Sequence, residues 1–233
     1  MERVMRQRLD DRTWAILKHL QRNWLSTAAV IHRLFYSAQA PLNTVHQKLR
    51  RMALKQLVKR HEIFTDEAHY TLGPAALKLF GLSPRHGEIA EGALVQRLAE
   101  LEFFCQPGQV RKRLLPHELI RSWPFFARYK AQALHRTWYV DLGEEDAPRK
   151  RLTLVISAFS ATSVSRKLHQ LRRWFHRWQL EIPELYSLVE SDSLALAILA
   201  TRACAEAYAE ALTEEPLPIP VRVHGNDDLL SLL

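Results

Sequence analysis

Cysteine is scarce in this 233-residue chain, which contains only Cys105 and Cys204. Both lie in apolar stretches with helical periodicity, so we expect no disulfide, and a reducing cytoplasmic setting fits. Long apolar runs are also missing, since the longest, residues 152–159 and 194–200, fall far short of a membrane span. The first residues lack the apolar core of a secretory signal, so we expect neither export nor a membrane protein.

Motifs for several kinds of catalysis and cofactor binding are absent as well. The chain has no G-x-x-x-x-G-K-[ST] or G-x-G-x-x-G loop that would cradle phosphates, and no G-x-S-x-G nucleophile motif. The two cysteines are distant and the 11 histidines are scattered, which gives no spacing typical of zinc ligands. We therefore expect no cofactor and no metal site.

Positive charge is what the chain has in excess, and it is unevenly distributed. The formal net charge is +8. Residues 1–82 contain 14 Lys and Arg against 6 Asp and Glu, whereas residues 83–233 contain 19 of each kind. A basic part joined to a neutral part indicates that the first binds a polyanion and the second has another role. A membrane surface is a poorer target, because no basic helix here has a large aromatic face.

The most informative stretch is residues 43–60, where apolar residues recur at helical steps of three and four. These residues are Val45, Leu49, Met52 and Ala53. Asn43 or Thr44 can cap the start of this helix. Its outer face is rich in donors suited to phosphate oxygens and to base edges in a major groove. The candidate DNA-binding residues are Asn43, Thr44, His46, Gln47, Lys48, Arg50, Arg51 and Lys55. A solvated surface helix is the alternative interpretation.

The flanking residues favour the DNA-binding interpretation. Asp10 or Asp11 caps a helix that runs to about Arg22, and Ser26-Thr27 caps a second one over residues 28–35. After residue 60 the apolar period changes from helical to two, which predicts a small hairpin. We expect its strands at residues 61–65 and 70–72 and its tip at residues 66–69. Three short helices, the third one basic, followed by a hairpin match a winged helix-turn-helix.

Three motifs in this part are Leu25-Ser26-Thr27, Leu49-Arg50-Arg51-Met52 and Tyr70-Thr71-Leu72-Gly73-Pro74. With their order in the chain, they resemble the replication-relaxation family found on plasmids and integrated mobile elements. The resemblance implies a winged helix-turn-helix that binds double-stranded DNA, which we place at residues 1–82. That family usually has glycine where the third helix ends, and this chain has Gln56. We expect a non-glycine residue in a left-handed turn there, at a cost of up to about 1 kcal/mol.

Residues 83–110 are interpreted as a linker and a connecting helix. The segment 83–88 has linker composition, and residues 89–105 predict a helix with a stripe of Leu94, Leu98 and Leu101. In winged-helix regulators, a helix at this position often pairs two subunits. Packing on its own domain is the alternative.

Residues 111–233 alternate between strand and helix patterns. We expect strands at 135–142, 151–159, 184–191 and 218–225, helices at 160–178 and 193–212, and a short terminal helix. This order predicts a mixed sheet with parallel strand pairs joined by crossover helices. The expected fold class is therefore α+β, with a winged helix-turn-helix followed by a small α/β domain.

The second part also resembles the second domain of the replication-relaxation family, whose sheet is similar to that of restriction-endonuclease-like nucleases. Such nucleases need an Asp and then a Glu-x-Lys on the next strand, to hold a divalent cation and orient water. Asp141 is suitably placed, but residues 152–159 contain no acidic residue and no lysine. The acidic residues 144–146 lie on a predicted turn, where a solvated loop explains them. We expect a degenerate domain without enzyme activity; an active nuclease is the alternative.

The segment 166–177 allows two interpretations, because it mixes five cations with apolar and aromatic residues. It predicts either a second nucleic-acid contact or partner surface, or an amphipathic helix whose arginine stems lie over a sheet. The covering role is favoured, because the second part is neutral overall.

Together these patterns predict a sequence-recognising double-stranded DNA-binding protein that forms a homodimer, with helix 43–60 in a major groove. The α/β domain is expected to be a non-catalytic dimerisation or partner-binding module. Transcriptional regulation in a bacterial mobile element or its host is the favoured role. An accessory role in plasmid replication or conjugative mobilisation fits the resemblance equally well. A promoter palindrome or an origin repeat as the binding site would separate the two roles.

Overall fold

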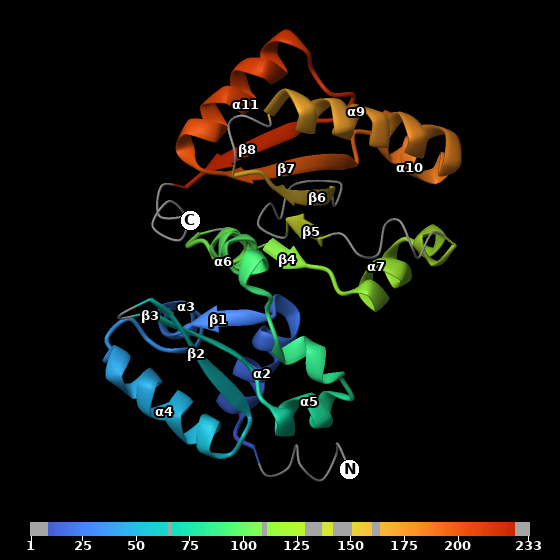
Figure 1. Cartoon of the computed structure of the whole chain (residues 1–233). Helices are drawn as coiled ribbons and strands as arrows, with labels where there is room; N and C mark the ends of the chain where they lie inside the picture. Colours follow the sequence, from blue (N-terminus) through green and yellow to red (C-terminus); the bar gives the residue numbers. More distant parts are fainter. Residues whose placement is uncertain are drawn as a thin grey trace. The chain divides into compact units, whose positions relative to one another are not determined.

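The chain forms two compact units, Met1–Cys105 and Gln106–Leu233 (Figure 1). The computed structural model describes residues 9–64, 67–108, 111–128, 137–141, 151–159 and 164–226. The first unit contains a three-stranded antiparallel sheet and the second a five-stranded mixed sheet, both combined with helices. The fold class is therefore α+β, as predicted. Among the described residues, no helix combines the length and apolarity that a bilayer crossing requires.

The described part of the first unit contains three helices before its hairpin, and the first two agree with the sequence-based expectation. They are α2 (Asp11–Asn23), α3 (Ala28–Phe35) and α4 (Leu42–Leu54). The Asp10 carboxylate caps α2 by accepting a hydrogen bond from the backbone N–H of Thr13 at 2.9 Å. The Thr27 hydroxyl caps α3 by accepting from the backbone N–H of Val30 at 3.2 Å. Each cap satisfies a donor that has no partner within its helix.

Helix α4 begins and ends earlier than predicted. The residue at its N-cap position is Pro41, with no side-chain cap hydrogen bond, so the predicted cap by Asn43 or Thr44 is wrong. The helix ends at Leu54 because the chain turns at Gln56, which has a left-handed φ of 55°. Residues 58–60, predicted to be helical, lie in a strand. The predicted non-glycine residue in a left-handed turn at Gln56 is confirmed.

The three-stranded sheet follows the order β1-β3-β2, and all its pairs are antiparallel. Its strands are β1 (Leu25–Thr27), β2 (Val58–Phe64) and β3 (Glu67–Leu72). The hairpin is longer than predicted, because residues 67–69 belong to a strand and not to its tip. His69 of β3 is buried opposite His61 of β2, so a polar side chain here faces inward. Thr65 and Asp66 lie outside the described residues.

The inner face of α4 contributes to the core of the first unit, as predicted. Val45, Leu49 and Met52 are buried, and Ala53 is half-buried against the same core. They pack with Ile16, Leu17 and Leu20 of α2, Ile31 of α3, and Val58 and Leu72 of the hairpin. This burial turns the opposite face of α4 toward solvent, because helical residues three and four apart share a face.

The segment that the sequence suggested as a linker is part of the first unit. After β3, the first unit continues with α5 (Pro74–Phe80), the 3₁₀ turn η1 (Pro84–Gly87) and α6 (Glu91–Phe104). Gly87 is buried, and its carbonyl accepts a hydrogen bond of 2.9 Å from the Thr71 hydroxyl. Helix α6 packs on α2 and β1. The unit boundary at Cys105 therefore differs from the predicted domain boundaries at residues 82 and 110.

The second unit is built on a sheet with the order β4-β5-β6-β7-β8. The pairs β4–β5 and β5–β6 are antiparallel, whereas β6–β7 and β7–β8 are parallel, which confirms the predicted mixed sheet. The strands are β4 (Arg111–Arg113), β5 (Thr137–Asp141), β6 (Leu152–Ser157), β7 (Leu194–Ala200) and β8 (Val221–Gly225). The helices are α7 (Pro116–Ser122), η2 (Pro124–Ala127), α9 (Val164–Glu181), α10 (Pro183–Glu190) and α11 (Arg202–Glu214).

Two predictions for the second unit are wrong. Residues 184–191 were expected to form a strand, but α10 is a helix whose apolar residues recur at helical spacing and whose first residue is Pro183. Residues 194–200 were expected to begin a helix, but they form β7, in which every residue is buried. A central parallel strand is apolar on both faces, and periodicity alone does not distinguish it from a buried helix.

Helices α9, α10 and α11 lie on one face of this sheet (Figure 1). Their shared core includes Leu171, Phe175 and Trp178 of α9, packed with Leu154 of β6 and Ile198 of β7. The expected covering role of α9 is therefore confirmed. The predicted turn at residues 143–150 and the short terminal helix after Asn226 lie outside the described residues.

Candidate nucleic-acid interface

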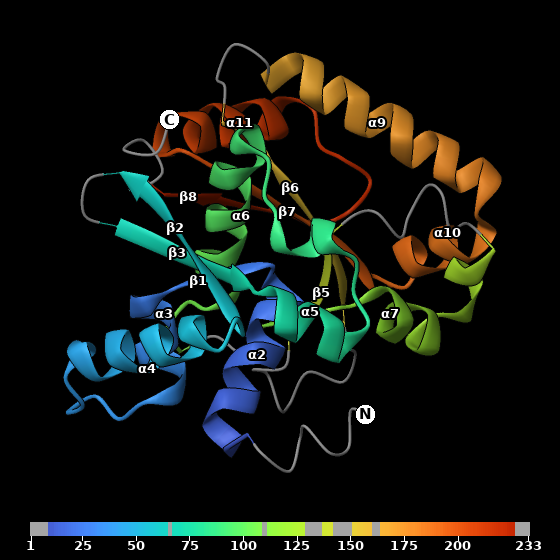
Figure 2. The ribbon, with the colours of Figure 1, turned by 60° about the horizontal axis from the view of Figure 1, so that its bottom comes forward.

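Helix α4 presents the predicted donor face to solvent. Figure 2 shows this helix beside the β2–β3 hairpin within the first unit. Of the eight candidate residues, seven are exposed: Asn43, Thr44, His46, Gln47, Arg50, Arg51 and Lys55. Asn43, His46, Gln47 and Arg50 follow steps of three and four, so they share one side of the helix. The structure thus brings together two amides, an imidazole and a guanidinium group on a single exposed face.

The cations of this face are available for an external partner. Among the described residues, no acidic side chain forms an ion pair with Arg50, Arg51 or Lys55. A cation held by an internal carboxylate has to break that ion pair before it can bind a phosphate, and these three have no such pair to lose. They are therefore the cations of α4 best placed to contact an anion.

Lys48 differs from its neighbours on α4. Its Nζ atom lies 2.7 Å from Oδ2 of Asp10, and its side chain is only 23% exposed. Asp10 is also the cap of α2, so this ion pair joins the start of one helix to the middle of another. The hydrogen bonds from Lys48 and from the backbone of Thr13 hold the pKa of Asp10 well below its usual range. The geometry gives Lys48 a role in holding α4 against α2.

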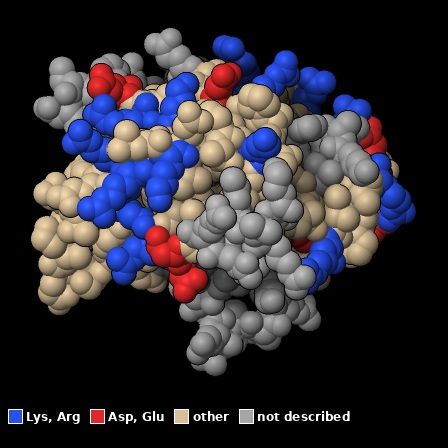
Figure 3. All heavy atoms as spheres, turned by 90° about the horizontal axis from the view of Figure 1, so that it is seen from below, with Lys and Arg blue, Asp and Glu red and all other residues tan. Residues whose placement is uncertain are grey.

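Two further cations extend the basic surface beyond α4. Lys59 and Arg60 are exposed on β2, which follows α4 after the turn at Gln56. Arg60 forms an exposed ion pair of 2.8 Å with Glu62, whereas Lys59 has no acidic partner among the described residues. In Figure 3, lysine and arginine side chains gather in a patch that contains few acidic ones. Sequence reasoning missed both cations because it assigned them to the end of a helix.

The middle of the hairpin is a neutral, hydrogen-bonded region. The rings of His61 and His69 stack with their centroids 4.8 Å apart. Nε2 of His61 donates to the hydroxyl of Thr71 at 3.0 Å, since that hydroxyl in turn donates to the carbonyl of Gly87. Burial lowers the pKa of His69 to about 4, and burial together with Lys59 lowers the pKa of His61. These histidines fix the hairpin and add no cation at neutral pH.

The nuclease-like site that the resemblance implies is incomplete in the described part of the second unit. Asp141 ends β5 and is opposite Arg111 of β4 in register, and β6 beside it carries no carboxylate. Within the described ranges, no group of three His, Cys, Asp or Glu is placed to hold a metal ion. Residues 144–146 lie outside those ranges, so the expected lack of nuclease activity stays a prediction.

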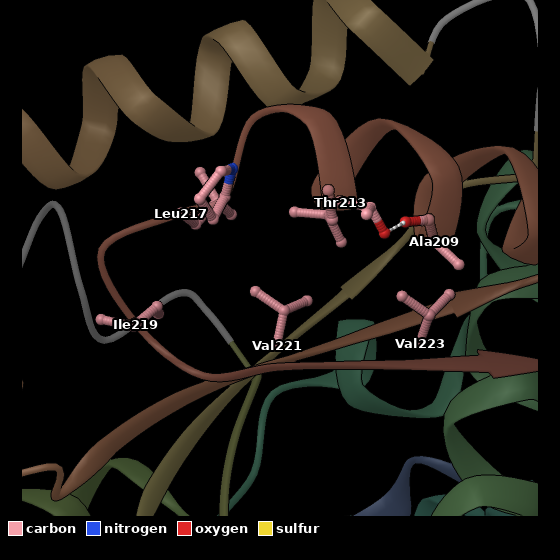
Figure 4. A pocket seen from close by; sticks show the side chains of 8 residues that line it. Ala209, Thr213, Leu217, Ile219, Val221 and Val223 are labelled. Carbon is pink, nitrogen blue, oxygen red and sulfur yellow. Dashed lines mark hydrogen bonds between the residues drawn. The ribbon is translucent and has the colours of Figure 1, made fainter.

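One pocket in the second unit is lined mainly by apolar side chains. It has a volume of 440 Å³ and lies between α11 and β8. Figure 4 shows Val221 and Val223 of β8 facing Thr213 and Leu217 across it. The hydroxyl of Thr213 donates to the carbonyl of Ala209 at 2.9 Å, so the one polar side chain of the lining is already hydrogen-bonded. The lining contains no group suited to acid–base or nucleophilic chemistry.

The exposed face of α4 therefore has the chemical character of an anion-binding surface. It combines free cations with amide and hydroxyl donors on a rigid helix whose other face is buried. Comparison of the chain with protein-family models, curated proteins and solved structures finds no match.

Proposed function

We propose that this protein binds double-stranded DNA through a winged helix-turn-helix formed by its first unit. The element order α2, β1, α3, α4, β2, β3 and the strand order β1-β3-β2 support this assignment. Helix α3 packs on α4, and α4 is the helix with an exposed basic face. In such an arrangement the second helix of the pair enters the major groove.

The observation that carries the proposal is the division of α4 into two faces. Val45, Leu49 and Met52 anchor it to the core, while its opposite face exposes donors that no described carboxylate neutralises. A major groove about 12 Å wide accepts one α-helix of about 10–12 Å diameter. Arg50, Arg51 and Lys55 would contact phosphates or guanine edges. Further base or backbone contacts would come from Asn43, Thr44, His46 and Gln47.

The biological role proposed for this binding is transcriptional regulation in a bacterial mobile element or its host, by a homodimer. Dimers of this class read two half-sites about one helical turn apart, so the target should be a palindrome. The second unit would supply the dimer contact or the surface for a protein partner. Footprinting on the DNA that neighbours its own gene would test this role, because an origin repeat would instead indicate replication or mobilisation.

The test of DNA binding is the salt dependence of affinity. Replacing Arg50 and Arg51 by Ala should weaken binding and reduce the slope of log K against log salt by about 0.9 per lost phosphate contact. Lys78→Ala removes an exposed cation from α5 of the same unit and is the matched control, which should leave the slope unchanged. Fluorescence anisotropy with a labelled duplex measures the slope, and circular dichroism checks folding. An unchanged slope for the double variant would reject the proposed docking.

A further inference from the structure

Helix α9 of the second unit has an exposed face whose charge is unlike the rest of that unit. Residues 106–233 carry 17 Lys and Arg against 15 Asp and Glu, so the unit is nearly neutral. Five of those cations fall in the 18 residues of α9, with Glu181 as the only acidic residue of the helix. Local charge of one sign on a nearly neutral unit indicates a local anionic partner.

The structure separates the two faces of this helix. Val164, Leu168, Leu171, Phe175 and Trp178 are buried, so the covering role accounts for one side only. The exposed side follows helical steps of three and four and forms the stripe Arg166, His169, Gln170, Arg173, His176 and Arg177. Every member of this stripe carries at least one N–H donor.

The ion pairs around α9 leave part of the stripe free. Arg172, beside the stripe, is held by Glu215 at 2.5 Å, and Arg177 by Glu181 at 2.7 Å. Lys167 lies over the ring of Trp174, with its Nζ 5.7 Å from the centroid. Among the described residues, no acidic side chain pairs with Arg166 or Arg173. These two arginines are therefore the free cations of the helix.

The composition of the stripe distinguishes between two kinds of anionic partner. A protein surface that binds an acidic protein needs apolar or aromatic anchors at its centre. The stripe has none, and the exposed Leu180 lies beyond its end. A phosphate backbone requires only cations and hydrogen-bond donors, and duplex DNA carries one negative charge per about 1.7 Å of axis. From Arg166 to Arg177 the helix rises by about 16 Å, enough to meet several phosphates.

We propose that the exposed face of α9 is a second DNA contact, which binds the phosphate backbone without reading its sequence. Arg166 and Arg173 provide the main phosphate contacts, and His169, Gln170 and His176 add hydrogen bonds. This contact belongs to the second unit, so it does not depend on α4 entering a groove. It gives the protein an affinity for DNA of any sequence.

The experiment uses the full chain and a duplex of random sequence. Replacing Arg166 and Arg173 by Gln should reduce the slope of log K against log salt by about 1.8, which is about 0.9 for each lost contact. Arg121→Gln removes an exposed cation from α7 of the same unit and serves as the matched control. We expect the control to leave the slope unchanged. An unchanged slope for the α9 variant, or an equal fall per residue for Arg121→Gln, overturns the proposal.

The same substitutions in the Arg50→Ala, Arg51→Ala background separate this contact from the one proposed for α4. The slope should fall again by the same amount, because the two contacts are independent. If only the α4 substitutions lower the slope, the proposal of an α9 contact is wrong and the proposed function stands. Polyglutamate is the competing probe: if the α9 substitutions weaken its binding but not that of the duplex, an acidic protein replaces DNA as the partner.

Discussion

At the scale of single residues, the junction between α4 and the hairpin depends on Gln56 and Gly73. Gln56 has a left-handed φ of 55°, and its carbonyl accepts a hydrogen bond of 3.0 Å from the backbone N–H of Ala75. Gly73 donates to the carbonyl of Leu57 at 3.0 Å and lies directly against Gln56. This contact fixes the point where the proposed recognition helix ends and strand β2 begins.

Gly73→Ala should destabilise the first unit by about 1–3 kcal/mol, because there is no room for a Cβ atom. An added Cβ would lie 2.3 Å from the carbonyl oxygen of Gln56, which is backbone and cannot rotate away. Gly92→Ala is the matched control, since nothing lies within 4 Å of its added Cβ on helix α6. It should be neutral or stabilising by up to about 1 kcal/mol. Urea unfolding of the full chain measures the stability of both variants. Equal unfolding midpoints for Gly73→Ala and Gly92→Ala would contradict the role of Gly73.

Some of these residue-scale features were predictable from the sequence and others were not. The left-handed turn at Gln56 was expected because the resemblance placed glycine at that position, and local conformation follows from local sequence. The pairing of Lys48 with Asp10 was not expected, since it joins residues 38 apart in the chain. Sequence pattern identifies a donor on a helix face but does not show which donors the fold itself engages.

At the scale of elements, periodicity predicted those helices and strands that have one buried and one exposed face. Helices α4 and α9 were placed correctly apart from their ends. The fully buried β7 was not, because a strand that is apolar on both faces has no period of two. Strand β4 is only three residues long and was missed, since so short an element gives no measurable period.

The packing of α2 and β3 also predicts how stability depends on pH. Nε2 of His19 on α2 donates to the hydroxyl of Ser26 at 3.0 Å, while its Nδ1 accepts from the amide of Asn23 at 3.1 Å. Burial lowers the pKa of His19 to about 4, as it does for His69 of β3. The unfolded chain, with a pKa of about 6.5 for each imidazole, binds these protons first as pH falls.

Stability should therefore be lost as pH falls from about 6.5 to about 4, and these two groups should contribute no further loss below that. The loss from His19 is at most about 3.5 kcal/mol, since one pKa unit corresponds to about 1.4 kcal/mol. Urea unfolding at several pH values measures this loss of stability. A His19→Gln, His69→Gln variant separates the contribution of the two histidines from that of titrating carboxylates. A variant with the same pH dependence as the parent would show that the two histidines do not cause the loss.

At the scale of the whole molecule, the charge asymmetry indicated two parts, but it did not show where the first one ends. The structure extends the first unit to Cys105, because α6 returns to pack on α2 and β1. The guanidinium of Arg97 lies 5.0 Å from the ring of Trp24, and Arg33 forms an ion pair of 3.2 Å with Glu102. These contacts join residues about 70 apart in the chain, which no local pattern reveals.

The extent of the first unit gives a test with two fragments. Residues 1–105 should unfold cooperatively, whereas residues 1–82 lack α6 and should be less stable by at least about 2 kcal/mol. In the shorter fragment Trp24, which has an unfavourable φ of 72°, loses both Arg97 and its stacking partner His86. Thermal unfolding followed by circular dichroism compares the stability of the two fragments, and equal stability would show that α6 is a connector.

Fragment 1–105 should also bind DNA more weakly than the full chain if the second unit supplies the dimer contact, because a monomer engages one half-site instead of two.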